Sequence, residues 1–63
     1  MKEASKIVNA KEDSLGHKVQ LNDLTESQMN QIKTTSVDQD HWLKVHIYVF
    51  SDESYILVET NKI

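Results

Sequence analysis

Two runs of β-branched and aromatic residues constrain this chain most, because only a short polar turn separates them. The first run covers residues 42–50 (WLKVHIYVF) and the second covers residues 55–60 (YILVET). Residues of these types favour extended backbone, and two such runs around a polar tetrad (SDES) are typical of a β-hairpin. The sequence therefore predicts a C-terminal hairpin over residues 42–63.

The predicted hairpin has two faces, because successive side chains of a strand point to opposite sides of the sheet. A loop of two residues and a loop of four residues both place Phe50 opposite Tyr55. In that register an aliphatic face consists of Leu43, Val45, Ile47, Val49, Ile56 and Val58. We expect this face to form the core under the helix that carries Met29 and Ile32.

The second face of the hairpin is the candidate partner-binding site, because all four aromatic residues of the chain fall on it. It consists of Trp42, Lys44, His46, Tyr48, Phe50, Tyr55, Leu57 and Glu59. Exposed aromatic patches tend to mark binding surfaces, and Tyr and Trp are enriched at interface hot spots. Two other interpretations stay open: the N-terminal segment could cover this face, or the aromatic pairs could serve only to stabilise the hairpin.

A helix start is the clearest local signal elsewhere in the chain, at residues 24–29 (LTESQM). Thr25 fits the N-cap, Gln28 completes a capping box, and Leu24 and Met29 are spaced as a hydrophobic staple. The run TTSV at residues 34–37 ends the helix, because β-branched residues and serine are poor helix formers. A helix of about ten residues needs a sheet to pack on. We expect residues 37–40 to be a polar connection.

The single glycine, Gly16, divides the N-terminal part of the chain. Residues 13–16 fit a type I turn between strands at residues 6–10 and 18–21. The alternative is a helix over residues 3–15 that is capped by Gly16. With the hairpin favoured, the expected fold is α+β, a small two-layer ββαββ domain with an antiparallel sheet and one short helix on one face.

Length and composition limit the function classes. A chain of 63 residues is a single domain, 1–63, that buries only about 60% of its unfolded surface. It has no cysteine, so neither disulfides nor thiolate metal sites add stability, and association is the remaining common route. The net charge of −3 and the absence of arginine disfavour nucleic acid. The same lysine bias fits an AT-rich coding sequence, which hints at a bacterial or phage source.

The candidate chemistry is weak. Asp38, Asp40, His41 and His46 resemble a loose set of metal ligands, but a surface acidic loop explains them better, and we expect no metal and no cofactor. His46 and Glu59 are expected to pair across the hairpin, which could make an interaction pH-sensitive. No nucleophile motif or phosphate loop is present, so we expect no enzyme. No export signal or membrane span is recognisable, which predicts a cytoplasmic protein.

Two functions from different classes remain at this point. The first is a non-enzymatic interaction module, a regulator or inhibitor that binds a partner protein or a second copy of itself through the aromatic face. The alternative is a nucleic-acid-binding accessory protein that stacks bases on Tyr48, Phe50 and Tyr55. Binding to mixed oligonucleotides that is lost as salt rises would favour the alternative.

Overall fold

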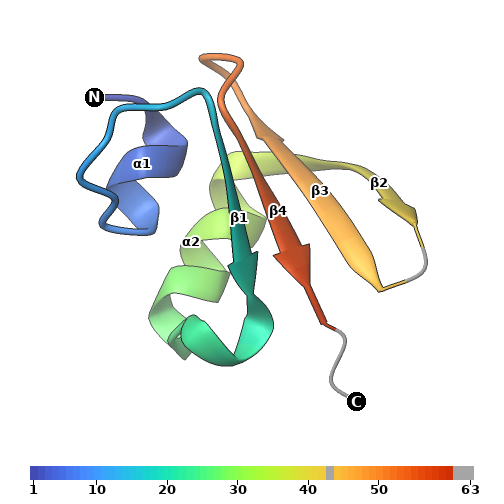
Figure 1. Cartoon of the computed structure of the whole chain (residues 1–63). Helices are drawn as coiled ribbons and strands as arrows, with labels where there is room; N and C mark the ends of the chain where they lie inside the picture. Colours follow the sequence, from blue (N-terminus) through green and yellow to red (C-terminus); the bar gives the residue numbers. More distant parts are fainter. Residues whose placement is uncertain (43, 61–63) are drawn as a thin grey trace.

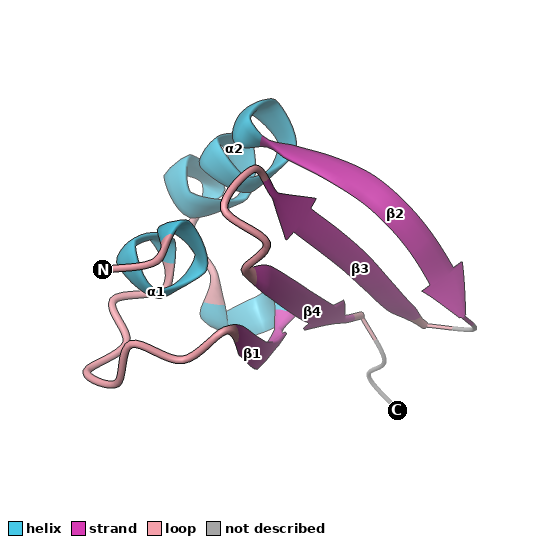
Figure 2. Ribbon diagram, turned by 90° about the horizontal axis from the view of Figure 1, so that it is seen from above, coloured by secondary structure: helices cyan, strands magenta, loops and turns pink. Residues whose placement is uncertain are grey.

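The computed structural model describes residues 1–42 and 44–60, and the predicted α+β class is confirmed (Figure 1). Along these residues the elements are α1 (Glu3–Ile7), β1 (Gly16–Gln20), the 3₁₀ turn η1 (Leu21–Asp23), α2 (Glu26–Thr35), β2 (Ser36–Trp42), β3 (Val45–Phe50) and β4 (Tyr55–Glu59). Both helices lie on the same side of the sheet (Figure 2). The described residues therefore form two layers, and none of their helices lies on the other face of the sheet.

The sheet is mixed, so the prediction of an antiparallel sheet in a ββαββ order is wrong. The strand order is β1-β4-β3-β2. β3 pairs antiparallel with both β4 and β2, whereas β1 pairs parallel with β4. The parallel pair is possible because the whole of α2, β2 and β3 connects the two strands, which gives the long crossover that parallel strands need.

The N-terminal segment is a short helix and not the predicted strand at residues 6–10. α1 ends at Ile7 with Val8 as its C-cap, and the next residue, Asn9, has a φ of 56°. The amides of Asn9 and Ala10 donate to the carbonyls of Lys6 and Ser5, as in a Schellman motif. Asparagine tolerates this left-handed backbone better than most residues, so it ends the helix where a glycine would be expected. Gly16 caps no helix; it begins β1.

Helix α2 begins as predicted, because its cap is local. Thr25 Oγ1 accepts from the Gln28 amide at 3.0 Å, and Gln28 Oε1 accepts from the Thr25 amide at 2.8 Å. Leu24 and Met29 both pack against the core. At the other end, the hydroxyls of Thr34, Thr35 and Ser36 donate to the carbonyls four residues earlier, a bond that Ser and Thr commonly make to their own helix.

The predicted polar connection at residues 37–40 is part of strand β2. This edge strand pairs only with β3, and its register shifts between Asp38 and Asp40, so Gln39 is an extra residue. An edge strand is exposed along one side and can hold polar residues, which is why its sequence resembled a loop. The predicted run over residues 42–50 is likewise divided: Trp42 ends β2 and Val45 begins β3. Leu43, which was predicted to lie on the aliphatic face, is outside the described residues.

The C-terminal hairpin is present, but its register differs by one residue from the predicted one. Its loop has three residues: the Glu53 amide donates to the Phe50 carbonyl, Glu53 has a φ of 75°, and the Phe50 amide donates to the Ser54 carbonyl. This is a type I turn followed by a left-handed residue. Val49 therefore lies opposite Tyr55. An odd loop length exchanges the faces of one strand relative to the other.

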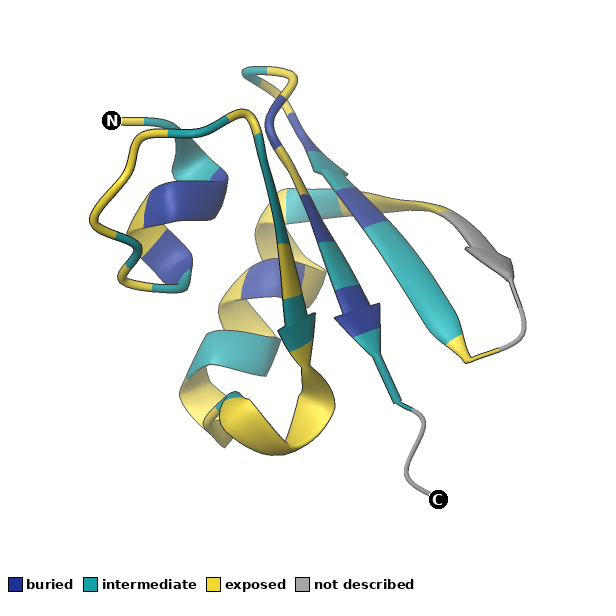
Figure 3. Ribbon diagram, in the orientation of Figure 1, coloured by how far each residue is buried: buried dark blue, intermediate teal, exposed yellow. Residues whose placement is uncertain are grey.

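The core lies between the two helices and the covered face of the sheet. The buried apolar residues are Ala4, Ile7, Ile32, Tyr48, Phe50, Ile56 and Val58. They come from α1, α2, β3 and β4 (Figure 3). Ile32 is the buried residue of α2 and ties that helix to the sheet.

Candidate functional site

The sheet face without helices is the candidate site, and we call it the open face. Its apolar residues are Val37, Val45, Ile47, Val49, Tyr55 and Leu57, from β2, β3 and β4. Val37 is 65% exposed and Tyr55 is 36% exposed, while the other four are half-buried. A contiguous apolar surface that crosses three strands is the usual mark of an interaction surface.

The open face is edged by polar side chains on the β1 side. Lys18 and Gln20 of β1 lie beside Leu57 and Glu59 of β4. The Lys18 ammonium is 3.5 Å from a Glu59 carboxylate oxygen, and the Gln20 amide donates to the same carboxylate. The two opposite charges therefore compensate each other within the face.

Gly16 begins β1 at a place where the Tyr55 ring lies over the backbone. A Cβ added to Gly16 would be 2.2 Å from two carbons of that ring, which is inside van der Waals contact. The ring belongs to an exposed and rotatable side chain, so it could move away. Because Gly16 has no side chain, the Tyr55 ring can lie over it and form the aromatic part of the open face.

Replacing Gly16 with alanine is expected to displace the Tyr55 ring from the sheet and leave the fold intact. The expected loss in the free energy of unfolding is about 1 kcal/mol, because the ring gives up packed area and no buried polar group is exposed. Near-UV circular dichroism and urea denaturation would measure the two effects. An unchanged tyrosine signal in the variant would contradict the predicted contact.

The eight residues predicted to share the aromatic face are divided by the observed register. Phe50 is 2% exposed and Tyr48 is 8% exposed, and both lie in the core with Ile56 and Val58. Burial raises the pKa of Tyr48, and the neighbouring Asp38 carboxylate raises it further. The prediction that these two aromatic residues lie on an exposed face with Tyr55 is wrong, because the three-residue loop moved them to the covered face.

The remaining predicted site residues lie in several places. Tyr55, Leu57 and Glu59 are on the open face, and Lys44 is exposed in the turn before β3. The side chain of Trp42 lies outside the described residues. Val45, Ile47 and Val49 were missed as site residues because the predicted register assigned the aliphatic residues of β3 to the core. Val37 was missed because residues 37–40 were predicted to be a polar connection.

The predicted pair of His46 and Glu59 is also wrong. Glu59 lies opposite Val45, and His46 lies opposite Val58 on the covered face. The His46 ring stacks instead with that of Tyr48, two residues along the same strand, with ring centroids 6.2 Å apart. The two side chains therefore lie on opposite faces of the sheet and provide no basis for a pH-sensitive pair.

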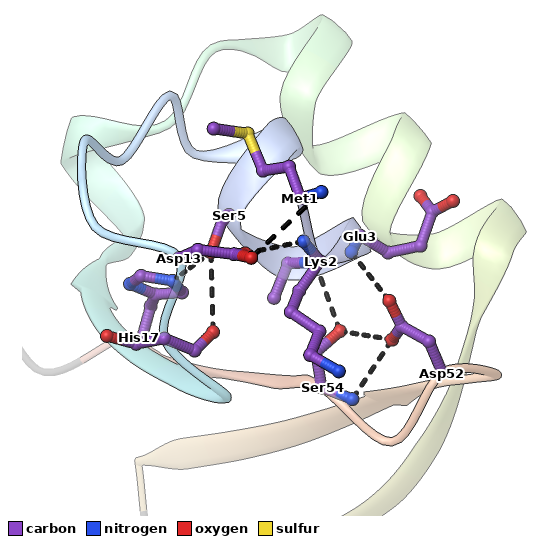
Figure 4. Close-up of polar contacts among 10 residues, drawn as sticks. Met1, Lys2, Glu3, Ser5, Asp13, His17, Asp52 and Ser54 are labelled. Atoms are coloured by element: carbon purple, nitrogen blue, oxygen red, sulfur yellow. Dashed lines mark hydrogen bonds and ion pairs between the residues drawn. The ribbon is translucent and has the colours of Figure 1, made fainter.

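A second polar cluster joins α1 to the loop of the hairpin (Figure 4). Asp52 accepts from the Glu3 amide at 2.8 Å and from the amide and hydroxyl of Ser54 at 3.0 and 2.5 Å. Ser54 Oγ in turn accepts from the Ala4 amide at 3.1 Å. These are first-turn amides of α1, whose own N-cap residue Lys2 provides no side-chain bond. The loop thus caps the helix from a distant part of the sequence.

The stability of the fold is expected to fall in acid partly through Asp52. Hydrogen bonds from the Ser54 hydroxyl and then from the Glu3 and Ser54 amides lower its pKa to about 2. A depressed pKa in the folded state contributes stability that is present above the unfolded value of about 3.9 and is lost as the pH falls toward about 2. Thermal unfolding between pH 5 and pH 2 would therefore show a shallower decline for Asp52→Asn than for the wild type. Parallel declines would contradict this role.

Ser5 and His17 form the contact that most resembles catalytic chemistry. Ser5 Oγ is 2.8 Å from His17 Nε2 and 3.3 Å from the Ser14 carbonyl (Figure 4). A serine beside a histidine base makes up two of the three residues of a hydrolase triad. Ser5, however, is 0% exposed, so no substrate could reach its oxygen. The contact instead connects α1 to β1, and we assign it a structural role.

Among the side chains that the structure describes, no group of three or more His, Asp or Glu residues could hold a metal ion. The side chains of Asp40 and His41, which belonged to the loose ligand set of the sequence, lie outside the described residues. Among the described helices, none has the length and apolar character needed to cross a membrane.

Compared with known proteins, the chain matches no family model, no curated protein and no solved structure.

Proposed function

We propose that the protein is a small non-enzymatic interaction module, a regulator or inhibitor that binds a partner protein through the open face. The supporting observation is the placement of six apolar side chains on a sheet face that neither helix covers. Val37 and Tyr55 are the most exposed of them. Burial of apolar area is the main source of affinity at protein interfaces, and aromatic residues are enriched there.

The binding residues in this proposal differ from those that the sequence predicted. Tyr55, Leu57 and Glu59 stay in the site, and Val37, Val45, Ile47 and Val49 join it. His46, Tyr48 and Phe50 leave it because they lie on the covered face. Glu59 and Lys18 lie at the rim, where polar residues commonly surround an apolar centre.

Nucleic-acid binding is not proposed. That function needed Tyr48, Phe50 and Tyr55 as a stacking platform, and the first two are buried. The buried Ser5 hydroxyl likewise gives no support to an enzyme.

Partner capture with matched variants tests the proposal. Tagged wild type, Leu57→Lys and Gln31→Lys would each be incubated with a lysate of the native host, and the retained proteins identified by mass spectrometry. Gln31 is an exposed residue of α2, so its variant adds the same charge away from the open face. We expect a partner that the wild type and Gln31→Lys retain and that Leu57→Lys loses by about tenfold or more, the effect of about 1.4 kcal/mol.

Retention of the same partner by Leu57→Lys would move the site away from the open face. Because Leu57 is half-buried, circular dichroism of each variant is needed to show that the fold is kept. Val37→Lys is the second face variant, since Val37 is 65% exposed and its replacement disturbs the core least.

A further inference from the structure

We propose that the open face binds a second copy of this chain, so that two sheets pack face to face around a two-fold axis. This inference rests on the proposed function, since it names the partner of the same face. Two sheets that pack in this way lie about 10 Å apart, with apolar side chains from both inner faces between them. In a two-fold dimer the same patch is used on both copies, so the face must be complementary to itself.

The charges of the open face favour a copy of itself as the partner. Among the side chains that the structure describes, the charged ones on this face are Lys18 and Glu59, and they pair with each other at 3.5 Å. Among these described side chains, a strongly charged partner would find no unpaired opposite charge. Two neutral apolar faces bring no like charges together, although the chain as a whole has a net charge of −3.

The edges of the sheet are poorer sites for self-association than its face. At the β2 edge, the extra residue Gln39 interrupts the ladder and Asp38 is exposed beside it. Bulges and charged residues on edge strands are known protections against pairing with another chain. At the other edge, β1 has five residues and carries Lys18. Face-to-face packing avoids both obstacles.

The small core supplies a reason for the dimer. The chain has no cysteine, and along the described residues no cluster could hold a metal ion. Oligomerisation is the common remaining way to stabilise a domain of this size. A face-to-face dimer would convert half-buried residues such as Ile47, Val49 and Leu57 into core residues.

The size of the face predicts a weak and reversible dimer. Four strands about 4.8 Å apart and about five residues long, at about 3.3 Å per residue, give about 300 Å² in projection on each copy. Side chains that project from the sheet increase this area, but it stays below about 800 Å² per partner, the size of a standard interface. We therefore expect a dissociation constant of about 10–100 µM.

Single-cysteine variants test this arrangement directly, because the natural chain has no thiol. Leu57→Cys places one thiol at the middle of the open face, and Gln31→Cys places one on the exposed side of α2. Each purified variant would be oxidised at about 100 µM and at about 1 µM, and disulfide-linked dimer followed over time. We expect Leu57→Cys to cross-link at least about tenfold faster than Gln31→Cys at the higher concentration, with the difference lost on dilution.

Sedimentation equilibrium of the wild type, Val37→Lys and Gln31→Lys provides the second measurement. We expect the wild type and Gln31→Lys to dimerise with the same constant, and Val37→Lys to dimerise at least about tenfold more weakly. A wild type that is monomeric up to about 1 mM, equal cross-linking of the two thiols, or dimerisation unchanged by Val37→Lys would each overturn the inference. If the wild type is monomeric and the host partner is still lost in Leu57→Lys, the proposed function stands and only the dimer is excluded.

Discussion

Replacing Phe50 with alanine is expected to lower the free energy of unfolding by about 3–5 kcal/mol, because it leaves a cavity in the core. Phe50 is 2% exposed and packs with Ile32, Ile56 and the residues of α1 in one cluster. A chain of 63 residues has a total stability of only about 3–9 kcal/mol, at about 0.05–0.15 kcal/mol per residue. We therefore expect Phe50→Ala to be largely unfolded at 37 °C.

The matched control is Tyr55→Ala, which also removes one aromatic ring from the same hairpin. Tyr55 is on the open face and is 36% exposed, so its loss is expected to cost about 1 kcal/mol. Urea denaturation of both variants measures the difference. Phe50→Leu, which removes less volume, keeps the comparison measurable if Phe50→Ala does not fold. Equal costs for Phe50→Ala and Tyr55→Ala would place the two rings on one face and contradict the observed register.

Replacing Ile32 with alanine is expected to cost about 2–5 kcal/mol. Ile32 is 0% exposed and is the buried residue of α2, so this side chain provides much of the packing between the helix and the sheet. A ten-residue helix is unstable alone, and its helicity depends on this packing. We expect both the thermal midpoint and the far-ultraviolet helical signal at 37 °C to fall.

The control for Ile32→Ala is Gln31→Ala at the neighbouring exposed position of α2. Alanine favours helix slightly more than glutamine, so this change is expected to be neutral or stabilising by a few tenths of a kcal/mol. If Gln31→Ala destabilised the protein as much as Ile32→Ala, the orientation of α2 would be wrong.

The features that the sequence predicted well depend on neighbouring residues. The capping box of Thr25 and Gln28 satisfies its own hydrogen bonds within one helical turn, and it was found with its partners. The hairpin itself was predicted from composition and a polar turn. Both signals are contained in short stretches of chain, so no knowledge of distant contacts was needed.

The features that the sequence did not predict depend on distant contacts. The three-residue loop is held by Asp52 and Ser54, which bond to the amides of Glu3 and Ala4 about 50 positions away. The left-handed Glu53 has no sequence signal, because glycine is the usual residue at that position. An error of one residue in the loop exchanged the two faces of β3 relative to β4, so His46, Tyr48 and Phe50 lie on the covered face and not with Tyr55.

Other errors have similar causes. The parallel pairing of β1 with β4 joins segments about 40 residues apart, and no local pattern in β1 indicates it. Asn9 was a possible stop signal for α1, since asparagine is the second choice after glycine for a left-handed helix cap. A short Asp-x-Ser loop was the one signal that could have indicated the polar cluster at Asp52.

The register of the hairpin is the central claim, because it decides which residues form the open face. Nuclear Overhauser effects between α-protons measure it directly, since residues in non-hydrogen-bonded pairs have Cα atoms about 4.5 Å apart. The Phe50 amide donates to the Ser54 carbonyl across the end of the hairpin. Hydrogen-bonded and non-hydrogen-bonded pairs alternate along an antiparallel ladder, so the next pair, Val49 with Tyr55, is a non-hydrogen-bonded one. The structure predicts strong α-proton effects for Val49 with Tyr55 and for Ile47 with Leu57. Effects between Phe50 and Tyr55 in their place would contradict it.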